Sequence, residues 1–130
     1  MNVKQSGNAF ERQVANILRD HYGYQTRRGV QFRSGQEEAD VVGLPRIHIE
    51  CKFYGDINAS RLEAWMAQSE HDAQPDEYPA VFWKKKKVPG INVMMRTRDF
   101  IAMTTGAEVH SGGKVTMLLE DFMRVYEETR

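Results

Sequence analysis

The chain has 130 residues, of which 41% are hydrophobic and 28% are charged. These proportions are typical of a globular protein and exclude collagen-like, long disordered and membrane-embedded classes. The 18 basic residues balance 18 acidic ones, so the net charge of zero gives no sign of the basic character usual in nucleic-acid-binding domains. We expect a single domain over residues 1–130, cytoplasmic and without a membrane partner, because we recognise no signal peptide or membrane-spanning run.

The first third of the chain begins with a helical pattern. Apolar residues at helical spacing predict a helix over residues 6–22, with Ser6 or Asn8 as its cap and Gly23 as its end. The following stretch, residues 24–32, contains strand-like residues interrupted by glycine, and then the chain becomes polar. It predicts one short strand followed by a loop.

Two apolar segments, residues 39–44 and residues 47–53, flank a short turn, so we expect them to form a hairpin. In the second segment, apolar residues alternate with His48, Glu50 and Lys52. Alternate side chains of a strand point to opposite faces of the sheet. This strand should therefore have one apolar and one polar face.

The rest of the chain alternates between helical and strand patterns. A capping-box pattern in Ser60-Arg61-Leu62-Glu63 predicts that a second helix begins there and ends near Pro75. Further strands and helices are expected over residues 80–83, 91–95, 99–103, 115–118 and 121–128. This succession predicts an α/β fold, with a central mixed sheet flanked by helices and a core order of α-β-β-β-α-β-β.

Glu50 and Lys52 share the polar face of their strand, and Asp40 lies at the start of the partner strand. The hairpin could therefore bring both carboxylates to one point. Two acids and a lysine are costly to hold together unless a cation lies between the acids. Mg²⁺ is the natural candidate because it prefers oxygen ligands. We expect Asp40, Glu50 and the backbone carbonyl of Cys51 to hold it, with Mn²⁺ as a substitute.

A metal site of this composition would hydrolyse phosphodiester bonds. The metal would polarise the phosphoryl group and lower the pKa of a bound water, while Lys52 would orient that nucleophile and offset charge in the transition state. Glu11, on the first helix, could assist a second ion or hold the water. Alternatively, these charges form structural ion pairs in a non-catalytic module that binds nucleic acid or a protein partner.

The pattern Glu11, Asp40, Glu50-x-Lys52 resembles the PD-(D/E)xK nuclease superfamily. Residues 7–12 are similar to the first helix of archaeal-type Holliday junction resolvases. This resemblance implies a restriction-endonuclease-like core in which these four residues are catalytic. It also implies a Mg²⁺-dependent DNA endonuclease that works as a homodimer on branched DNA. Small phage-type endonucleases of the superfamily share the four positions, so branched DNA is a preference among several substrates.

The resemblance further implies that basic and polar residues near the site contact DNA. It gives this role to Arg12, Arg27, Arg28, Arg33 and Ser34. The Lys84-Lys85-Lys86-Lys87 run has two interpretations. Lys84 and Lys86 could bind phosphates, which the nearby Arg96 and Arg98 would favour, or the lysines could protect a strand end from aggregation.

Three other residues have a simpler expected role. Cys51 should be a small buried residue, since it points away from Glu50, and as the only cysteine it excludes a disulfide within the chain. Trp65 on the second helix is expected in the core. Gln68, one helical turn later, could point toward the site, as polar residues do on this helix in many nucleases that the chain resembles.

Overall fold

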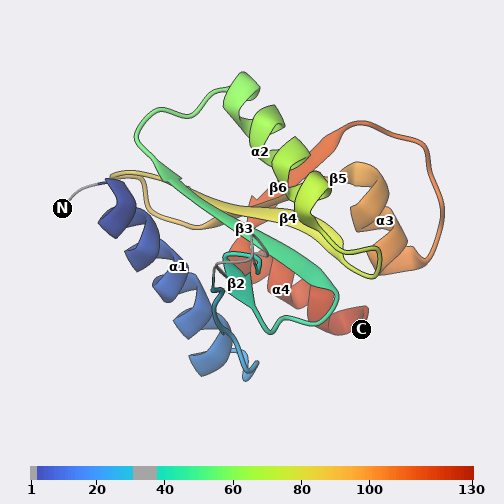
Figure 1. Ribbon diagram of the computed structural model, residues 1–130. Helices are drawn as coiled ribbons and strands as arrows, with labels where there is room; N and C mark the ends of the chain where they lie inside the picture. Colours follow the sequence, from blue (N-terminus) through green and yellow to red (C-terminus); the bar gives the residue numbers. More distant parts are fainter. Residues whose placement is uncertain (1–2, 31–37) are drawn as a thin grey trace.

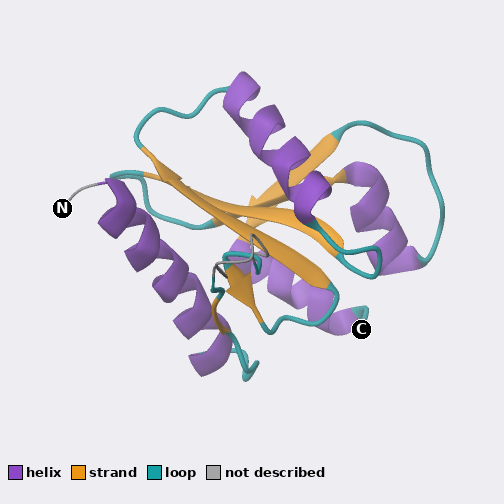
Figure 2. Cartoon of the chain, in the orientation of Figure 1, coloured by secondary structure: helices purple, strands orange, loops and turns teal. Residues whose placement is uncertain are grey.

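The computed structural model describes residues 3–30 and 38–130 of the chain. Through this part of the molecule runs a six-stranded sheet with its strands in the order β1-β2-β3-β4-β5-β6. Figures 1 and 2 show helices on both faces of the sheet. The prediction of an α/β fold with a central mixed sheet and flanking helices is therefore confirmed.

The elements follow one another as predicted, with wider bounds in most cases. The helices of the described part are α1 (Val3–Asp20), α2 (Ala59–Asp72), α3 (Thr97–Thr105) and α4 (Leu119–Glu128). Its strands are β1 (Arg27–Arg28), β2 (Val41–Val42), β3 (Ile47–Tyr54), β4 (Tyr78–Lys85), β5 (Asn92–Arg96) and β6 (Lys114–Leu118). Strands β3 and β4 pair in parallel, and the other neighbours pair antiparallel, which makes the sheet mixed.

Two helix ends show how local bonding sets the boundaries. Helix α1 ends at Asp20, two residues before the predicted end, and the turn after it closes at Gly23, which adopts a φ of 82° and donates its backbone N–H to the Arg19 carbonyl at 3.1 Å. Helix α2 begins one residue before the predicted Ser60. Its cap is Asn58, whose side-chain oxygen accepts the Arg61 backbone N–H at 2.9 Å. The capping-box prediction was thus wrong about the cap residue, because Asn58 satisfies the free N–H first.

Helices α1, α3 and α4 pack on one face of the sheet, and α2 packs on the other (Figure 1). The larger core contains Phe10 of α1, Phe122 of α4 and Ile49 of β3, all fully buried. The smaller core, under α2, contains Trp65, which is 7% exposed and so confirms the prediction that it is a core residue. Burying apolar area on both faces stabilises the sheet by roughly 25 cal/mol per Å².

The predicted hairpin is formed by β2 and β3, with Val41 opposite Ile49. Strand β3 also confirms the predicted alternation, since Ile49 and Cys51 belong to the larger core while Glu50 lies on the other face. Asp40 immediately precedes β2, so the hairpin brings its carboxylate to β3. None of the helices in the described part combines the length and hydropathy that a membrane span requires.

The helix cap offers a direct test of this local account. Replacing Asn58 by Ala should lower the free energy of unfolding by about 1 kcal/mol, because the Arg61 N–H loses its acceptor. The matched change Ser60→Ala should alter the free energy by less than about 0.5 kcal/mol, since Ser60 is exposed and lies inside the helix. Urea denaturation measures both changes. A larger loss for Ser60→Ala than for Asn58→Ala would contradict the assignment.

Candidate active site

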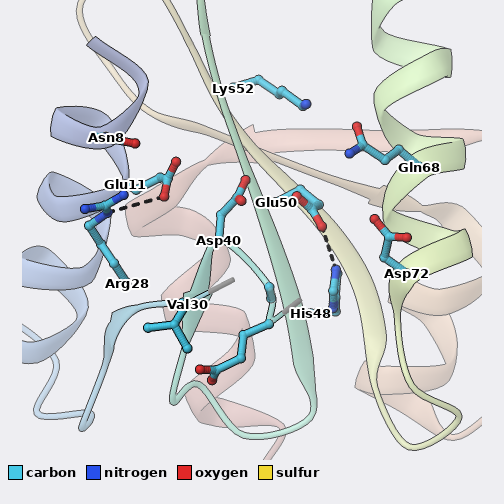
Figure 3. Close-up of a pocket in the computed structure, with 13 residues that line it drawn as sticks. Asn8, Glu11, Arg28, Val30, Asp40, His48, Glu50, Lys52, Gln68 and Asp72 are labelled. Atoms are coloured by element: carbon cyan, nitrogen blue, oxygen red, sulfur yellow. Dashed lines mark hydrogen bonds and ion pairs between the residues drawn. The ribbon is translucent and has the colours of Figure 1, made fainter. Parts of the chain in front are cut away.

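A polar cleft of about 520 Å³ opens where α1, the start of β2, strand β3 and α2 meet. Figure 3 shows side chains from all of these elements pointing into it. The cleft brings together all four residues predicted to be catalytic, Glu11, Asp40, Glu50 and Lys52. It is also lined by Asn8, Arg28, Gly29, Val30, Glu38, Ala39, His48, Gln68 and Asp72.

The carboxylate of Asp40 is fixed to the neighbouring strand. Its Oδ2 accepts the backbone N–H of Cys51 at 2.8 Å. The pKa of Asp40 is raised to about 7, mainly by burial and then by the neighbouring Glu50 carboxyl, while the hydrogen bond from Cys51 lowers it. Glu11 adds a smaller repulsion. Asp40 is therefore an acid that takes up a proton near neutral pH when no cation is present.

Glu50 is 6% exposed, and its Oε1 lies 2.8 Å from Nε2 of His48. The other nitrogen of that imidazole, Nδ1, lies 3.5 Å from Oε1 of Glu77, which precedes β4. Burial lowers the pKa of His48, but Glu50 and Glu77 outweigh burial and leave the pKa raised. One imidazole thus lies between two carboxylates.

Glu11 enters the cleft from α1 and faces Asp40 (Figure 3). Its Oε1 pairs with Nε of Arg28 at 3.4 Å, so Arg28 lies inside the cleft with part of its charge already compensated. Lys52 lines the cleft beyond Glu50, and Gln68 reaches it from α2 as expected. The cleft therefore holds acids from α1, the segment before β2, β3 and α2, together with one lysine and one arginine.

The donor set suits a hard divalent cation. Asp40 and Glu50 offer carboxylate oxygens at one point. Burial, and then repulsion between the two groups, raises the pKa of Asp40, and a positive charge between them would relieve that repulsion. Within residues 3–30 and 38–130, no group of three or more His, Cys, Asp or Glu side chains is placed to hold a metal ion. An ion at this point would therefore have these two carboxylates as protein ligands and would need water or substrate for the rest.

The backbone of Cys51 contacts the site through its N–H, which Asp40 accepts. A contact through its carbonyl, as the sequence predicts, remains a prediction. The thiol is buried in the larger core, and burial together with Asp40 raises its pKa well above the usual value. Cys51 is thus the small buried residue that was expected.

The residues predicted to contact DNA are dispersed. Arg12 is exposed on the outer side of α1, beside Gln13 and away from the cleft. Arg27 pairs with Glu38 at 2.9 Å and does not line the cleft. Arg28 does line it, paired with Glu11 as above. The remaining two of this group, Arg33 and Ser34, lie outside the described residues.

The lysine run lies at the turn between β4 and β5, outside the cleft. Lys84 donates to the carbonyl of Val88 and lies 5.9 Å from the centre of the Phe53 ring, so it also stabilises the turn. Lys86 is exposed, with its Nζ 5.7 Å from the same ring centre. Of the two predicted phosphate ligands, Lys86 is thus the more accessible, because Lys84 is also bonded within the turn.

Arg96 and Arg98 do not support that surface. Arg96 is buried and bonds to Glu63 and Glu70 at 2.9 and 3.0 Å, and Arg98 also pairs with Glu70. The sequence interpretation took them as support for a phosphate-binding lysine run, but both guanidinium groups pair with acids of α2. These half-buried pairs link α2 to the junction of β5 and α3.

Several lining residues had no predicted role in the site, among them Asn8, His48 and Asp72. The sequence analysis gave His48 no part in the site, although it shares the polar face of β3 with Glu50. That shared face was the signal that could have identified it. Asn8 and Asp72 belong to helices whose orientation toward the hairpin no local pattern reveals.

The raised pKa of Asp40 predicts that Asp40→Asn stabilises the metal-free protein at pH 8. Asp40 releases its proton near 3.8 in the unfolded chain but near 7 in the folded one. Between these values the folded state binds more protons, so the free energy of unfolding falls as pH rises, by about 4 kcal/mol at most. The substitution removes this loss, and an amide can still accept the Cys51 N–H.

Urea denaturation without divalent ions should therefore show the Asp40→Asn variant to be more stable than wild type at pH 8. Near pH 4, where wild-type Asp40 is protonated, the difference should vanish. Asp76→Asn, at an exposed turn, serves as the matched control and should show no such pH dependence. A destabilised Asp40→Asn protein at pH 8 would contradict this prediction.

Comparison with known proteins agrees with this geometry. A family model described as "Phage putative PDDEXK endonuclease" matches residues 2–121. No curated protein is similar enough in sequence to count as a relative of the chain. The mixed sheet with flanking helices is that of a restriction-endonuclease-like fold, and nucleases of this superfamily generally depend on a divalent metal. The chain therefore belongs to the phage PD-(D/E)xK endonuclease family.

Proposed function

We propose that this protein is a Mg²⁺-dependent endonuclease that hydrolyses phosphodiester bonds in DNA. The observation that carries the proposal is the convergence of Asp40, Glu50 and Lys52 in one polar cleft, with Asp40 bonded to the β3 backbone. Glu11 pairs with Arg28 and Glu50 contacts His48, but among the described residues Asp40 forms no ion pair with a basic side chain. Burial, and then the neighbouring Glu50 carboxyl, raises the pKa of Asp40, so a cation bound here would stabilise its charged form.

Asp40 and Glu50 hold the ion in this proposal, assisted by the backbone carbonyl of Cys51. When bound, Mg²⁺ supplies a Lewis acid for the phosphoryl oxygens and lowers the pKa of a bound water. The protein fixes the position of Asp40 in advance, because the Cys51 N–H holds its carboxylate. Mn²⁺ should substitute, since it also accepts carboxylate and water ligands.

Lys52 orients the attacking water and offsets the negative charge that builds on the phosphate in the transition state. Its position two residues after Glu50 places it on the same face of β3, at the mouth of the cleft. Glu11 holds Arg28 in place and, with a second ion, would act as an additional ligand. Arg28 then faces the phosphate backbone of the substrate.

DNA contacts outside the cleft come in this proposal from Lys84 and Lys86, at the turn after β4, and from Arg12 and Arg27 on the α1 side. Each phosphate contact of this kind adds affinity that decreases with salt. Because the net charge of the chain is zero, DNA affinity should also depend on the bound divalent ion. Arg33 and Ser34 are proposed to contact DNA on the basis of the resemblance alone.

Two finer parts of the proposal also rest on the resemblance to junction resolvases. These are a preference for branched DNA and a homodimer with two active sites. The alternative is a module on the same fold that binds nucleic acid or a protein partner without cutting. It predicts salt-sensitive binding with no cleavage under any divalent ion.

Cleavage assays separate the two functions. Wild-type protein with Mg²⁺ should cut at least one of four-way junctions, flaps, single strands and linear duplexes, and junctions are expected to be cut fastest. Lys52→Ala should lower the cleavage rate by about 100-fold or more, because one stabilising contact in the transition state is lost. Asp40→Asn should abolish cleavage, because the ion loses a charged ligand.

The controls for this assay are Lys85→Ala and Asp76→Asn, which change exposed residues outside the cleft. Both should cut at the wild-type rate. Equal activity of wild type, Lys52→Ala and Asp40→Asn would refute the catalytic assignment. Binding without cleavage across the whole panel would favour the alternative module.

DNA affinity tests the lysine turn separately. In the Lys52→Ala background, which slows turnover, Lys86→Gln should weaken DNA binding about threefold to tenfold at low salt and reduce the salt dependence by about one phosphate contact. Arg124→Gln, at an exposed position of α4, is the matched control. Fluorescence anisotropy across salt concentrations measures both. If DNA affinity depended on salt equally in the two variants, Lys86 would not be a DNA contact.

A further inference from the structure

His48 is a buried histidine that the roles proposed above leave unused. It is 4% exposed and lies two residues before Glu50 on the same face of β3. Its ring lines the cleft but lies on the far side of Glu50 from Asp40 (Figure 3). His48 can therefore act on the site through Glu50.

The two ring nitrogens have different partners. Nε2 lies 2.8 Å from Oε1 of Glu50, which is a short hydrogen bond, and Nδ1 lies 3.5 Å from Oε1 of Glu77. That oxygen of Glu77 also accepts the backbone N–H of Gln74 at 2.9 Å. The imidazole is thus held on its Nδ1 side by the Glu77 carboxylate, which is itself hydrogen-bonded to the turn before β4.

The contact with His48 restrains the Glu50 carboxylate. Because Oε1 is bonded to His48, the carboxylate cannot rotate freely. Asp40 is restrained in a similar way, with Oδ2 bonded to the Cys51 N–H. Each acid therefore has one oxygen held by a neighbouring group, and the two carboxyl groups also share a hydrogen bond with each other.

We propose that His48 is a positioning residue that orients the Glu50 carboxylate for metal binding, and that Glu77 holds His48 in place. The inference rests on the metal site of the proposed function. Outer hydrogen bonds to metal ligands fix their orientation, and losing them typically weakens metal affinity by about 10–100-fold. This role requires only that the side chain of residue 48 place an N–H donor at the position of Nε2.

Two amide substitutions test that requirement. The side-chain nitrogen of glutamine can reach the position of Nε2, whereas that of asparagine reaches only the position of Nδ1. His48→Gln should therefore bind Mn²⁺ within about threefold of wild type, and His48→Asn should bind it about tenfold or more weakly. Electron paramagnetic resonance of free Mn²⁺, without DNA, measures the affinity directly. Thermal unfolding of each variant shows that it is folded.

Further variants complete the design. Glu77→Gln should weaken Mn²⁺ binding about threefold, because His48 loses the charge that holds it. His71→Gln is the matched control, since this exposed histidine at the end of α2 pairs with Asp72 and not with Glu50. It should leave Mn²⁺ affinity unchanged. Glu77→Gln also remains informative if both His48 variants unfold.

The outcomes separate this inference from the proposed function. If wild-type protein binds Mn²⁺ and His48→Gln and His48→Asn bind it equally well, the positioning role is overturned while the metal site stands. Wild-type affinity in Glu77→Gln would overturn the part given to Glu77. If wild-type protein binds no Mn²⁺ at all, both the inference and the proposed function are overturned.

Discussion

The site depends on one hydrogen bond, from the backbone N–H of Cys51 to the carboxylate of Asp40. Strand β2 has only two residues, so this side-chain bond extends the contact between β2 and β3 beyond the short ladder. It also brings a second acid next to the buried Glu50. Burial, and then repulsion from Glu50, raises the pKa of Asp40, so the carboxyl group needs a proton or a nearby cation.

The net charge of the protein is zero, but its acidic and basic side chains are arranged differently in different parts of the molecule. On the α2 side, Glu63 and Glu70 take up the charges of Arg96 and Arg98, so these four residues tie α2 to the strand–helix junction at the end of β5. In the cleft, Glu11 pairs with Arg28 and Glu50 contacts His48, but the Asp40 carboxyl lies beside that of Glu50. A neutral chain can thus have an acidic centre, and the ion that neutralises this centre in our proposal would also let the phosphate backbone approach.

The sequence alone predicted those parts of the fold and site that depend on short-range patterns. Alternation along β3 and the hairpin with β2 sufficed to place Asp40 near Glu50, because both follow from strand geometry. The start of α2 was predicted at Ser60 and its cap at Asn58 was missed, because both residues are of a type that caps helices. Burial of His48 and the pairing of Arg96 could not be predicted, because both depend on how α2 packs over the sheet.

The central claim is that Asp40 and Glu50 form a metal site. The most direct measurement is the anomalous diffraction of Mn²⁺ in crystals of wild-type protein and of the Asp40→Asn variant. The account predicts a peak between the carboxylates of Asp40 and Glu50 in the wild type, and a much weaker peak or none in the variant. A wild-type structure with no peak there, or a peak of equal height in both proteins, would contradict it.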